Sequence, residues 1–419
     1  MAGLVVRQAI EPFLAGAGPV VDMRSPAEFA QGHIPGARNL PLFSDEGRAA
    51  VGTTYKQQGR QAAVQLGLQL VGPRLGELGA SLSAWSLEAG GAPLRLHCWR
   101  GGMRSASVAW LAQTLDLPVA LLEGGYKVYR RWVLELLERP WPLRLLGGRT
   151  GTGKTDLLLA LARRGVAVLD LEGLAHHRGS SFGGLGLPPQ PSTEHYENRI
   201  AAVLQGCDPA TAEIWVEAES VQVGRCRVPA GIWRQMQSAP LLEVVRPLEE
   251  RLRQLVAVYG AQDPEELAEA TRRIARRLGP QRTAAALAAI AEGDWAAACR
   301  QMLDYYDRCY DHELERHVLQ GPDRQRQDQG IQGQARHPQQ GACQPSPGED
   351  SPDQQGHDQQ SPRPGPAPEA PDRRSVDLGF SSADQAADRL LAEGLMQSCS
   401  VPTVDPGPGG QGGPGQGPA

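Results

Sequence analysis

Lysine is almost absent from this chain of 419 residues. Its three lysines are Lys56, Lys127 and Lys154, so nearly all of the 42 basic side chains are arginines. There are 47 acidic side chains, which leaves a net charge of −5. A net charge so close to zero neither requires nor excludes nucleic acid as a partner. Only a local basic patch would indicate that the protein binds nucleic acid.

Paired cysteine spacings and long apolar runs are also missing. The seven cysteines form no Cys-x-x-Cys pair and no metal-type spacing, so the sequence gives no sign of a metal site or a disulfide framework. No signal peptide begins the chain, and no apolar run reaches the roughly 18–20 residues needed to span a bilayer. These features predict a cytoplasmic protein without membrane contact, in which a reactive thiol stays reduced.

Apolar residues become sparse after residue 319, where Gln, Pro, Gly and Asp dominate. A segment of that composition buries too little apolar surface to offset the entropy lost on ordering. The sequence therefore predicts a disordered tail over residues 319–419. The tail carries 13 acidic and 7 basic residues, so the preceding part, with 34 and 35, has a net charge of +1.

The first part of the chain predicts an α/β domain over residues 8–138. Short apolar runs at residues 19–24, 94–98 and 119–125 have the pattern of buried strands, and helical periodicity follows each of them. Strands that alternate with helices are typical of a parallel sheet covered on both faces.

A second α/β domain is predicted over residues 142–318, after a boundary at Pro140 and Pro142. It begins with a strand pattern, a glycine-rich loop and a helix pattern. From residue 247 the pattern is helical and rich in Ala and Arg, which predicts a helical C-terminal part for this domain.

The glycine-rich loop GRTGTGKT fits the pattern G-x-x-x-x-G-K-[ST] at every position. Glycines let such a loop fold so that its backbone N–H groups point at phosphate oxygens. A lysine then meets the terminal phosphate, and a hydroxyl ligates Mg²⁺ where that ion is used. ATP, GTP or another diphosphate would satisfy the same donors. The predicted phosphate-binding residues are Gly148, Arg149, Thr150, Gly151, Thr152, Gly153, Lys154 and Thr155.

Carboxylates follow two apparent strands of the second domain. Asp170 and Glu172 end one of them, and Glu217 ends another. Strand ends beside a P-loop are common positions for a carboxylate that binds Mg²⁺ or acts as a catalytic base. A helix cap or a solvated turn residue is an equally good interpretation of each.

The segment HCWRGGMRS at residues 97–105 lies between a strand pattern and a helix pattern. A thiol at Cys98 would sit among converging backbone N–H groups, at a helix N-terminus, beside Arg100 and Arg104. All three features favour a thiolate over a buried, inert cysteine, and they predict a nucleophile for an atom borne by an anionic donor.

Two longer motifs carry a family resemblance. DMRSPAEFAQGHIPGARNLPLF at residues 22–43 and LEGGYKVYRRWV at 122–133, with HCWRGGMRS between them, resemble a rhodanese domain. The fusion of that domain to a P-loop is similar to the tRNA 2-selenouridine synthase family. The motifs VGTTYKQQGR at 51–60 and HRGSSFGGLG at 177–186 are also similar to that family.

The resemblance implies an enzyme that transfers selenium-containing groups to tRNA. In this family, geranyl diphosphate first alkylates the sulfur of a wobble 2-thiouridine, and selenium from selenophosphate then replaces the alkylated sulfur. Cys98 would carry selenium as a selanylcysteine, and residues 148–155 would hold the diphosphate. No tightly bound cofactor is implied, Mg²⁺ remains open, and a selenophosphate-producing enzyme would be a donor partner.

A row of arginines offers one place for tRNA to bind. RRIARRLG puts four arginines on one helical face, and such a stripe suits a phosphate backbone. A merely solvated helix face explains the row equally well. The candidate tRNA contacts are Arg272, Arg273, Arg276 and Arg277.

Other functions use the same motifs. The segment containing Cys98 and Arg104 also fits His-Cys-x5-Arg-Ser, the signature of cysteine phosphatases, some of which share the rhodanese fold. That alternative gives the P-loop no role. A rhodanese-fold sulfurtransferase with a nucleotide-binding regulatory domain, and an ATP-driven regulator whose rhodanese domain only binds, are further alternatives.

Overall fold

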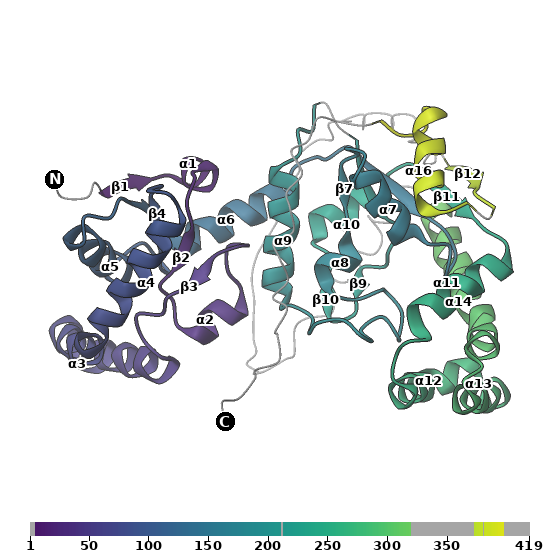
Figure 1. The fold of residues 1–419 in the computed structure, drawn as a ribbon, viewed down its shortest axis with the longest axis horizontal. Helices are drawn as coiled ribbons and strands as arrows, with labels where there is room; N and C mark the ends of the chain where they lie inside the picture. Colours follow the sequence, from purple (N-terminus) through teal and green to yellow (C-terminus); the bar gives the residue numbers. More distant parts are fainter. Residues whose placement is uncertain (1–4, 211–212, 320–372, 380, 398–419) are drawn as a thin grey trace, which may run out of the picture.

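The computed structural model describes residues 5–210, 213–319, 373–379 and 381–397. Two five-stranded sheets, one in each half of the molecule, carry helices on their faces (Figure 1). All the strand pairs of these two sheets are parallel, as the alternation of strand and helix patterns predicted. No helix of these described segments is long and apolar enough to cross a membrane.

The first sheet has the strand order β1-β5-β4-β2-β3. Its strands are β1 (Val5–Gln8), β2 (Val20–Asp22), β3 (Arg38–Asn39), β4 (Leu94–His97) and β5 (Val119–Leu122). β2, β4 and β5 are almost fully buried, as expected for a sheet covered on both faces. The carboxyl ends of β4 and β5 therefore place Cys98 and the glycine turn at Gly124 at the same edge.

Seven helical segments belong to this first domain. They are α1 (Ile10–Ala15), α2 (Pro26–Gln31), α3 (Asp45–Val71), η1 (Gly72–Arg74), α4 (Leu75–Glu88), α5 (Met103–Thr114) and α6 (Gly125–Glu138). α3 is interrupted at Gly59, whose φ of 85° is not helical. Three small residues, Gly47, Ala63 and Gly67, are its only buried ones, so most of α3 faces solvent.

The second sheet has the order β12-β11-β6-β8-β7. Its strands are β6 (Leu143–Gly147), β7 (Val168–Leu169), β8 (Ile214–Glu217), β11 (Leu241–Val245) and β12 (Arg373–Asp377), and β9 (Gln222–Val223) pairs antiparallel with β10 (Cys226–Arg227) beside it. β6 is central and buried, so the loop that follows it emerges from the middle of the sheet.

Helices surround this sheet and continue into a helical C-terminal part. Those beside the sheet are α7 (Lys154–Ala162), α8 (Leu171–Ala175), α9 (Thr193–Gln205), α10 (Ala230–Met236) and α16 (Ala383–Ala392). The helical part comprises α11 (Leu248–Tyr259), α12 (Pro264–Leu278), α13 (Pro280–Glu292) and α14 (Trp295–Leu319). This helical part confirms the prediction made from the Ala- and Arg-rich pattern.

The prediction of disorder over 319–419 is wrong for residues 373–379 and 381–397. β12 pairs parallel with β11 over its whole length, and α16 packs against α7. Val376, Leu390 and Met396 are buried in the core that these elements share. The average composition of the tail concealed this short apolar stretch. The rest of the predicted tail lies outside the described residues.

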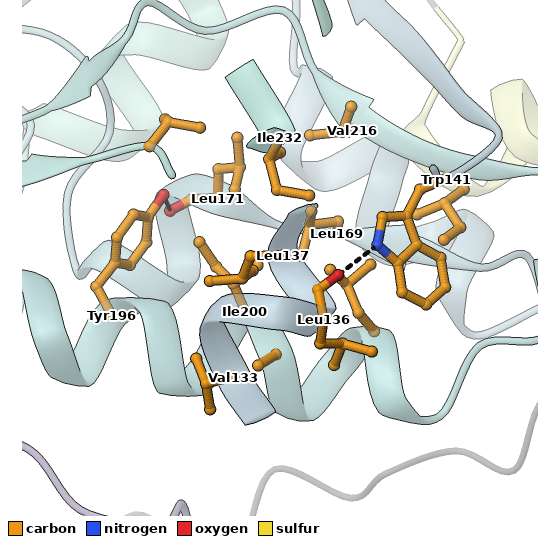
Figure 2. Packing of buried hydrophobic residues seen from close by; sticks show 14 of the residues in the cluster. Val133, Leu136, Leu137, Trp141, Leu169, Leu171, Tyr196, Ile200, Val216 and Ile232 are labelled. Carbon is orange, nitrogen blue, oxygen red and sulfur yellow. Dashed lines mark hydrogen bonds between the residues drawn. The ribbon is translucent and has the colours of Figure 1, made fainter. Parts of the chain in front are cut away.

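The two sheets are joined through a shared core around α6. Figure 2 shows Val133 and Leu137 of α6 among Leu169, Ile200 and Ile232 of the second domain. After α6 the chain passes Trp141, whose indole N–H donates to the carbonyl of Leu136 at 3.1 Å. α6 therefore runs from the glycine turn beside Cys98 to the strand that leads into the P-loop.

Candidate functional site

Cys98 follows β4 and lies at the bottom of a loop that ends where α5 begins. Its side chain is 3% exposed, and Sγ lies 3.2 Å from Oγ of Ser105. The carbonyl of Gly102 also lies 3.2 Å from this hydroxyl. The single hydroxyl proton can therefore go to that carbonyl or to a thiolate at Cys98, which it would hold in place. Ser105 was not predicted as a site residue, although the His-Cys-x5-Arg-Ser pattern contains it.

The backbone around Cys98 forms an open cradle of N–H groups. Within the described residues, the amides of residues 99–102 donate no hydrogen bond to the protein. Gly101 and Gly125 have φ values of +63° and +60°, and a Cβ atom at Gly125 would lie 2.3 Å from the carbonyl oxygen of Cys98. The two glycines thus allow the loop and the start of α6 to approach closely, and the free amides can receive an anion.

The two arginines of the loop differ in their surroundings. Arg104 forms an ion pair with Glu28 at 2.6 Å, and Arg48 lies 3.5 Å from the same carboxylate. Burial raises the pKa of Glu28, but the hydrogen bond and charge of Arg104 outweigh it, so that pKa is lowered. Arg100 is exposed and, in the described part of the chain, has no ion-pair partner. Arg104 is thus held by a carboxylate, and Arg100 alone remains exposed to an incoming donor.

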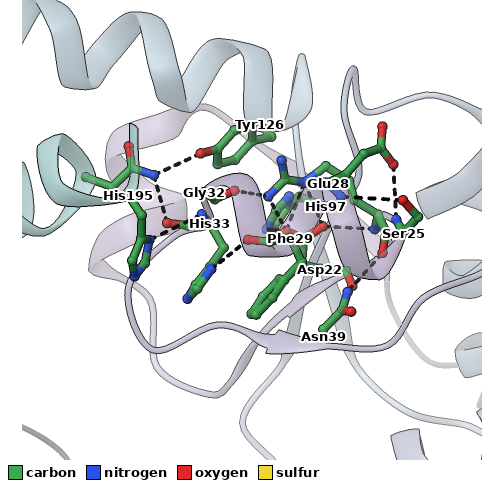
Figure 3. A network of polar contacts seen from close by, with 12 residues as sticks. Asp22, Ser25, Glu28, Phe29, Gly32, His33, Asn39, His97, Tyr126 and His195 are labelled. Carbon is green, nitrogen blue, oxygen red and sulfur yellow. Dashed lines mark hydrogen bonds and ion pairs between the residues drawn. The ribbon is translucent and has the colours of Figure 1, made fainter. Parts of the chain in front are cut away.

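A buried polar cluster lies beneath the cysteine loop (Figure 3). Arg24 binds Asp22 at 2.6 Å and lies 3.6 Å above the ring of Tyr126. Burial raises the pKa of Asp22, but His97 and Arg24 reverse this, so the pKa lies below its usual value. The imidazole of His97 is fully buried, which lowers its pKa. Sequence analysis did not predict this buried polar cluster, although Asp22 and Arg24 belong to the rhodanese-like motif.

Tyr126 connects the cysteine loop to the second domain. Its backbone N–H donates to the carbonyl of Cys98 at 2.8 Å, and its hydroxyl donates to Glu194 at 2.7 Å. Asn198, also on α9, donates to the same hydroxyl at 2.8 Å and to the carbonyl of His33 at 2.9 Å. The position of the cysteine loop is therefore fixed partly by α9 of the other domain.

The predicted P-loop lies between β6 and α7, as its sequence pattern requires. Gly148, Gly151 and Gly153 have φ values of +150°, +82° and +73°. Among the described hydrogen bonds, the amides of residues 149–151 and 153 are not used as donors, and the Lys154 ammonium donates to the carbonyl of Gly148 at 2.8 Å. This arrangement is a nest of free N–H groups at a helix N-terminus, and such nests commonly bind phosphate in other proteins.

Two of the predicted carboxylates meet the hydroxyl of Thr155. Thr155 lies 2.6 Å from Glu217 and 3.0 Å from Glu172. Burial raises the pKa of Glu217 well above its usual value, and the nearby charges of Glu172 and Asp170 raise it further. Burial and the charge of Glu219 likewise raise the pKa of Glu172. The third carboxylate, Asp170, caps α8 through the N–H of Gly173 at 2.7 Å, so the helix-cap interpretation holds for it.

An apolar pocket that is partly open to solvent lies beside the P-loop. Its empty space is about 540 Å³ including the part open to solvent, and Thr150 of the P-loop is one of its walls. The opposite walls come from α11, α12, α13 and α14, and from residues 180 and 182 of the HRGSSFGGLG motif. Sequence analysis missed this cavity. Its lining includes Leu255, Tyr259, Leu267, Ile290, Trp295, Ala298, Met302 and Tyr306.

The four arginines predicted to contact tRNA lie on α12. Arg272 pairs with Glu265 at 2.8 Å, and Arg273 lies 3.8 Å from Glu269, so two of the four have acidic partners on their own helix. Figure 1 places α12 at the opposite end of the long axis of the molecule from the first sheet. Their contact with tRNA stays a prediction.

No group of three or more His, Cys, Asp or Glu side chains is arranged to hold a metal ion within the described segments. A metal at the second loop would therefore need oxygen ligands beyond protein carboxylates. Thr155 and one carboxylate, together with phosphate oxygens of a substrate, make the set that Mg²⁺ commonly uses.

The two loops and their sheets define a rhodanese-like domain joined to a P-loop domain. Residues 7–131 match the rhodanese-like domain family, and residues 141–329 match the family described as tRNA 2-selenouridine synthase AAA domain. The chain belongs to the tRNA 2-selenouridine synthase family, as its motifs predicted. Its alignment with relatives of that name covers most of the length of each relative.

Three of these relatives give the extent of the similarity. The tRNA 2-selenouridine synthase of Marinobacter nauticus is 37% identical over 335 residues, covering 71% of this chain and 88% of that protein. The protein of the same name from Sulfurovum sp. is 35% identical over 334 residues, covering 72% and 90%. That of Cronobacter sakazakii is 45% identical over 253 residues, covering 58% and 65%.

Proposed function

We propose that this protein makes 2-selenouridine in tRNA by two successive group transfers. In the first, the sulfur of a wobble 2-thiouridine displaces diphosphate from geranyl diphosphate. In the second, the selenium of selenophosphate, held at the Cys98 loop, attacks C2 of the geranylated base and the geranylated sulfur leaves as geranyl thiol; water then breaks the P–Se bond and releases phosphate. Family membership supports the product, and the geometry of the two loops supports the division into two steps.

The apolar cavity beside the P-loop is the observation that carries the first step. A P-loop alone would suit ATP as well as any diphosphate. A geranyl donor also needs an apolar space within reach of the phosphates, and the cavity supplies one with Thr150 at its wall. The polar base and ribose of a nucleotide would gain little from walls such as Leu255, Ile290 and Met302.

The P-loop and its carboxylates account for the departure of diphosphate. Negative charge grows on the leaving oxygens as the bond to geranyl breaks, and the free amides of residues 149–151 together with Lys154 are placed to stabilise it. Mg²⁺, where bound by Thr155 and a carboxylate, would add positive charge at the same oxygens.

The second step follows from the chemistry of the first. A 2-thiouridine sulfur leaves poorly, whereas its alkylated form leaves as a thiol. Cys98 lies in a separate cradle of amides, with Arg100 exposed beside it, so an anionic selenium donor can bind there without competing for the P-loop.

Filling the cavity tests the first step. Ala298 is 2% exposed and lines the cavity, so Ala298→Phe would occupy the space intended for the geranyl chain. We expect the KM for geranyl diphosphate to rise about tenfold or more, since each CH₂ group left unburied loses about 0.8 kcal/mol. Inhibition by inorganic diphosphate should not change, because the P-loop is untouched.

Met302→Leu is the matched control, because it conserves volume in the same cavity and should leave the KM nearly as it is. Thermal unfolding of both variants separates cavity filling from damage to the fold. An unchanged KM in a folded Ala298→Phe protein would rule out this cavity as the geranyl site.

A further inference from the structure

The motif VGTTYKQQGR at residues 51–60 has no role in either loop, and within it Val51 packs against the core of the first domain. It lies in α3 up to the interruption at Gly59, and every residue from 55 to 61 is exposed. A helix segment that is polar on all sides is not stabilised by packing, so its side chains are candidates for a function other than stabilising the fold.

This segment lies beside the cysteine loop. A guanidinium nitrogen of Arg60 is 3.8 Å from the sulfur of Met103, the first residue of α5 after the loop. The interruption of α3 thus brings Arg60 to the rim of the cradle that contains Cys98, and Tyr55 and Lys56 lie on the turn of α3 just before it.

Exposed rings and cations lie on this part of α3 and on the cysteine loop. Tyr55 is 60% exposed, Met103 is 51% exposed, and Trp99 keeps a 36% exposed edge while its ring lies 5.8 Å from that of Tyr126. Lys56 and Arg60 are fully available to a partner, since in the described part of the chain neither forms an ion pair. Aromatic faces between unpaired cations are the features with which proteins bind unpaired nucleotides.

We propose that this rim binds the unpaired nucleotides of the RNA loop that contains the target base. The rim consists of Tyr55, Lys56 and Arg60 of α3 and of Trp99, Arg100 and Met103 beside Cys98. Tyr55 and Trp99 stack on bases, and the three cations meet phosphates. The inference rests on the proposed function, because it takes tRNA as the substrate.

The burial of Cys98 explains why the partner is a loop rather than a duplex. With the cysteine only 3% exposed, a base must leave its stack to bring its C2 position to the sulfur. Nucleotides of an RNA loop can splay outward in this way, whereas bases within a stem remain stacked and paired.

Binding of a fluorescently labelled RNA hairpin whose loop contains 2-thiouridine tests the proposal with the full chain. We expect Tyr55→Ala to raise the Kd about tenfold and Tyr55→Phe to stay within about twofold, because the ring stacks and the hydroxyl does not. The double variant Lys56→Ala/Arg60→Ala should reduce the slope of log Kd against log salt by about 1.4, at roughly 0.7 per lost phosphate contact.

Arg7→Ala is the matched control. It removes an exposed cation of the same domain on β1, a strand outside the rim, and should leave the Kd unchanged. Thermal unfolding confirms that each variant is folded. Unchanged Kd and salt slope in all the rim variants, or an equal loss in Tyr55→Phe and Tyr55→Ala, would overturn the proposal.

The same proteins separate this inference from the proposed function. Wild-type protein that binds the hairpin through the rim but transfers neither geranyl nor selenium would refute the proposed chemistry and leave the rim in place. Normal transfer and normal binding by the rim variants would refute the rim and leave the chemistry in place.

Discussion

Single residues of the site show how the chain holds groups that water would otherwise solvate. Glu28 neutralises Arg104, and Asp22 neutralises Arg24 beneath the loop. Among the described residues, no cation forms an ion pair with Glu217 and one of its oxygens has no hydrogen-bond partner. Its side chain is fully buried, and its pKa is raised by burial and by Glu172 and Asp170. Glu217 is therefore a residue at which pH should act on stability.

We expect Glu217→Gln to remove a pH dependence of stability. At low pH the carboxyl is protonated in both states and costs nothing. As pH rises past the ordinary pKa of a carboxyl, the unfolded chain ionises and is stabilised, while the folded chain stays protonated, so stability falls until the raised folded pKa is passed. Urea unfolding between about pH 4.5 and 8 should show that fall in the wild type and a flatter profile in the variant.

The variant keeps an acceptor for Thr155, so a change in hydrogen bonding is small. Exposed Glu249→Gln on α11 is the control and should follow the wild-type profile. Parallel profiles for Glu217→Gln and wild type would contradict the assignment of a strongly raised pKa to this carboxyl.

At the scale of elements, the two loops could be predicted because each is formed by consecutive residues of the sequence. GRTGTGKT and HCWRGGMRS carry their glycines, cations and nucleophile within nine positions, between a strand and a helix. Partners from distant segments could not be predicted. Glu28 pairs with Arg104, and Glu194 accepts a hydrogen bond from Tyr126. The apolar cavity forms where four helices meet a loop. The periodicity of a sequence does not reveal which helix faces will pack against each other.

The segment β12–α16 was not predicted from the sequence. We expect it to contribute to the free energy of unfolding. A chain ending at residue 372 would expose the edge of β11 and would lack the buried side chains of Val376, Leu390 and Met396, which leaves the rest of their apolar cluster uncovered. Each such side chain contributes about 1.5–3 kcal/mol, so a loss of several kcal/mol is expected in urea unfolding. A chain ending at residue 397 is the control, and equal stability of the two truncations would contradict this role.

At the scale of the whole molecule, the two loops are parts of one structure. α6 begins against Cys98 and its apolar face packs in the core of the second domain, while α9 of that domain holds Tyr126. The cysteine loop is thus positioned from both domains, although each domain supplies its own loop of free backbone amides. This arrangement suits the proposed chemistry, in which the two loops act in turn on one substrate.

The most direct test of the central claim is a two-stage reaction of the purified full chain with 2-thiouridine tRNA, followed by nucleoside mass spectrometry. With geranyl diphosphate alone, wild type and Cys98→Ser should both form geranylated 2-thiouridine, and Gly151→Pro should not, because it distorts the P-loop at a φ of +82°. When selenophosphate is added, only wild type should convert that nucleoside to 2-selenouridine. Loss of geranylation in Cys98→Ser, or selenation by it, would contradict the assignment of one step to each loop.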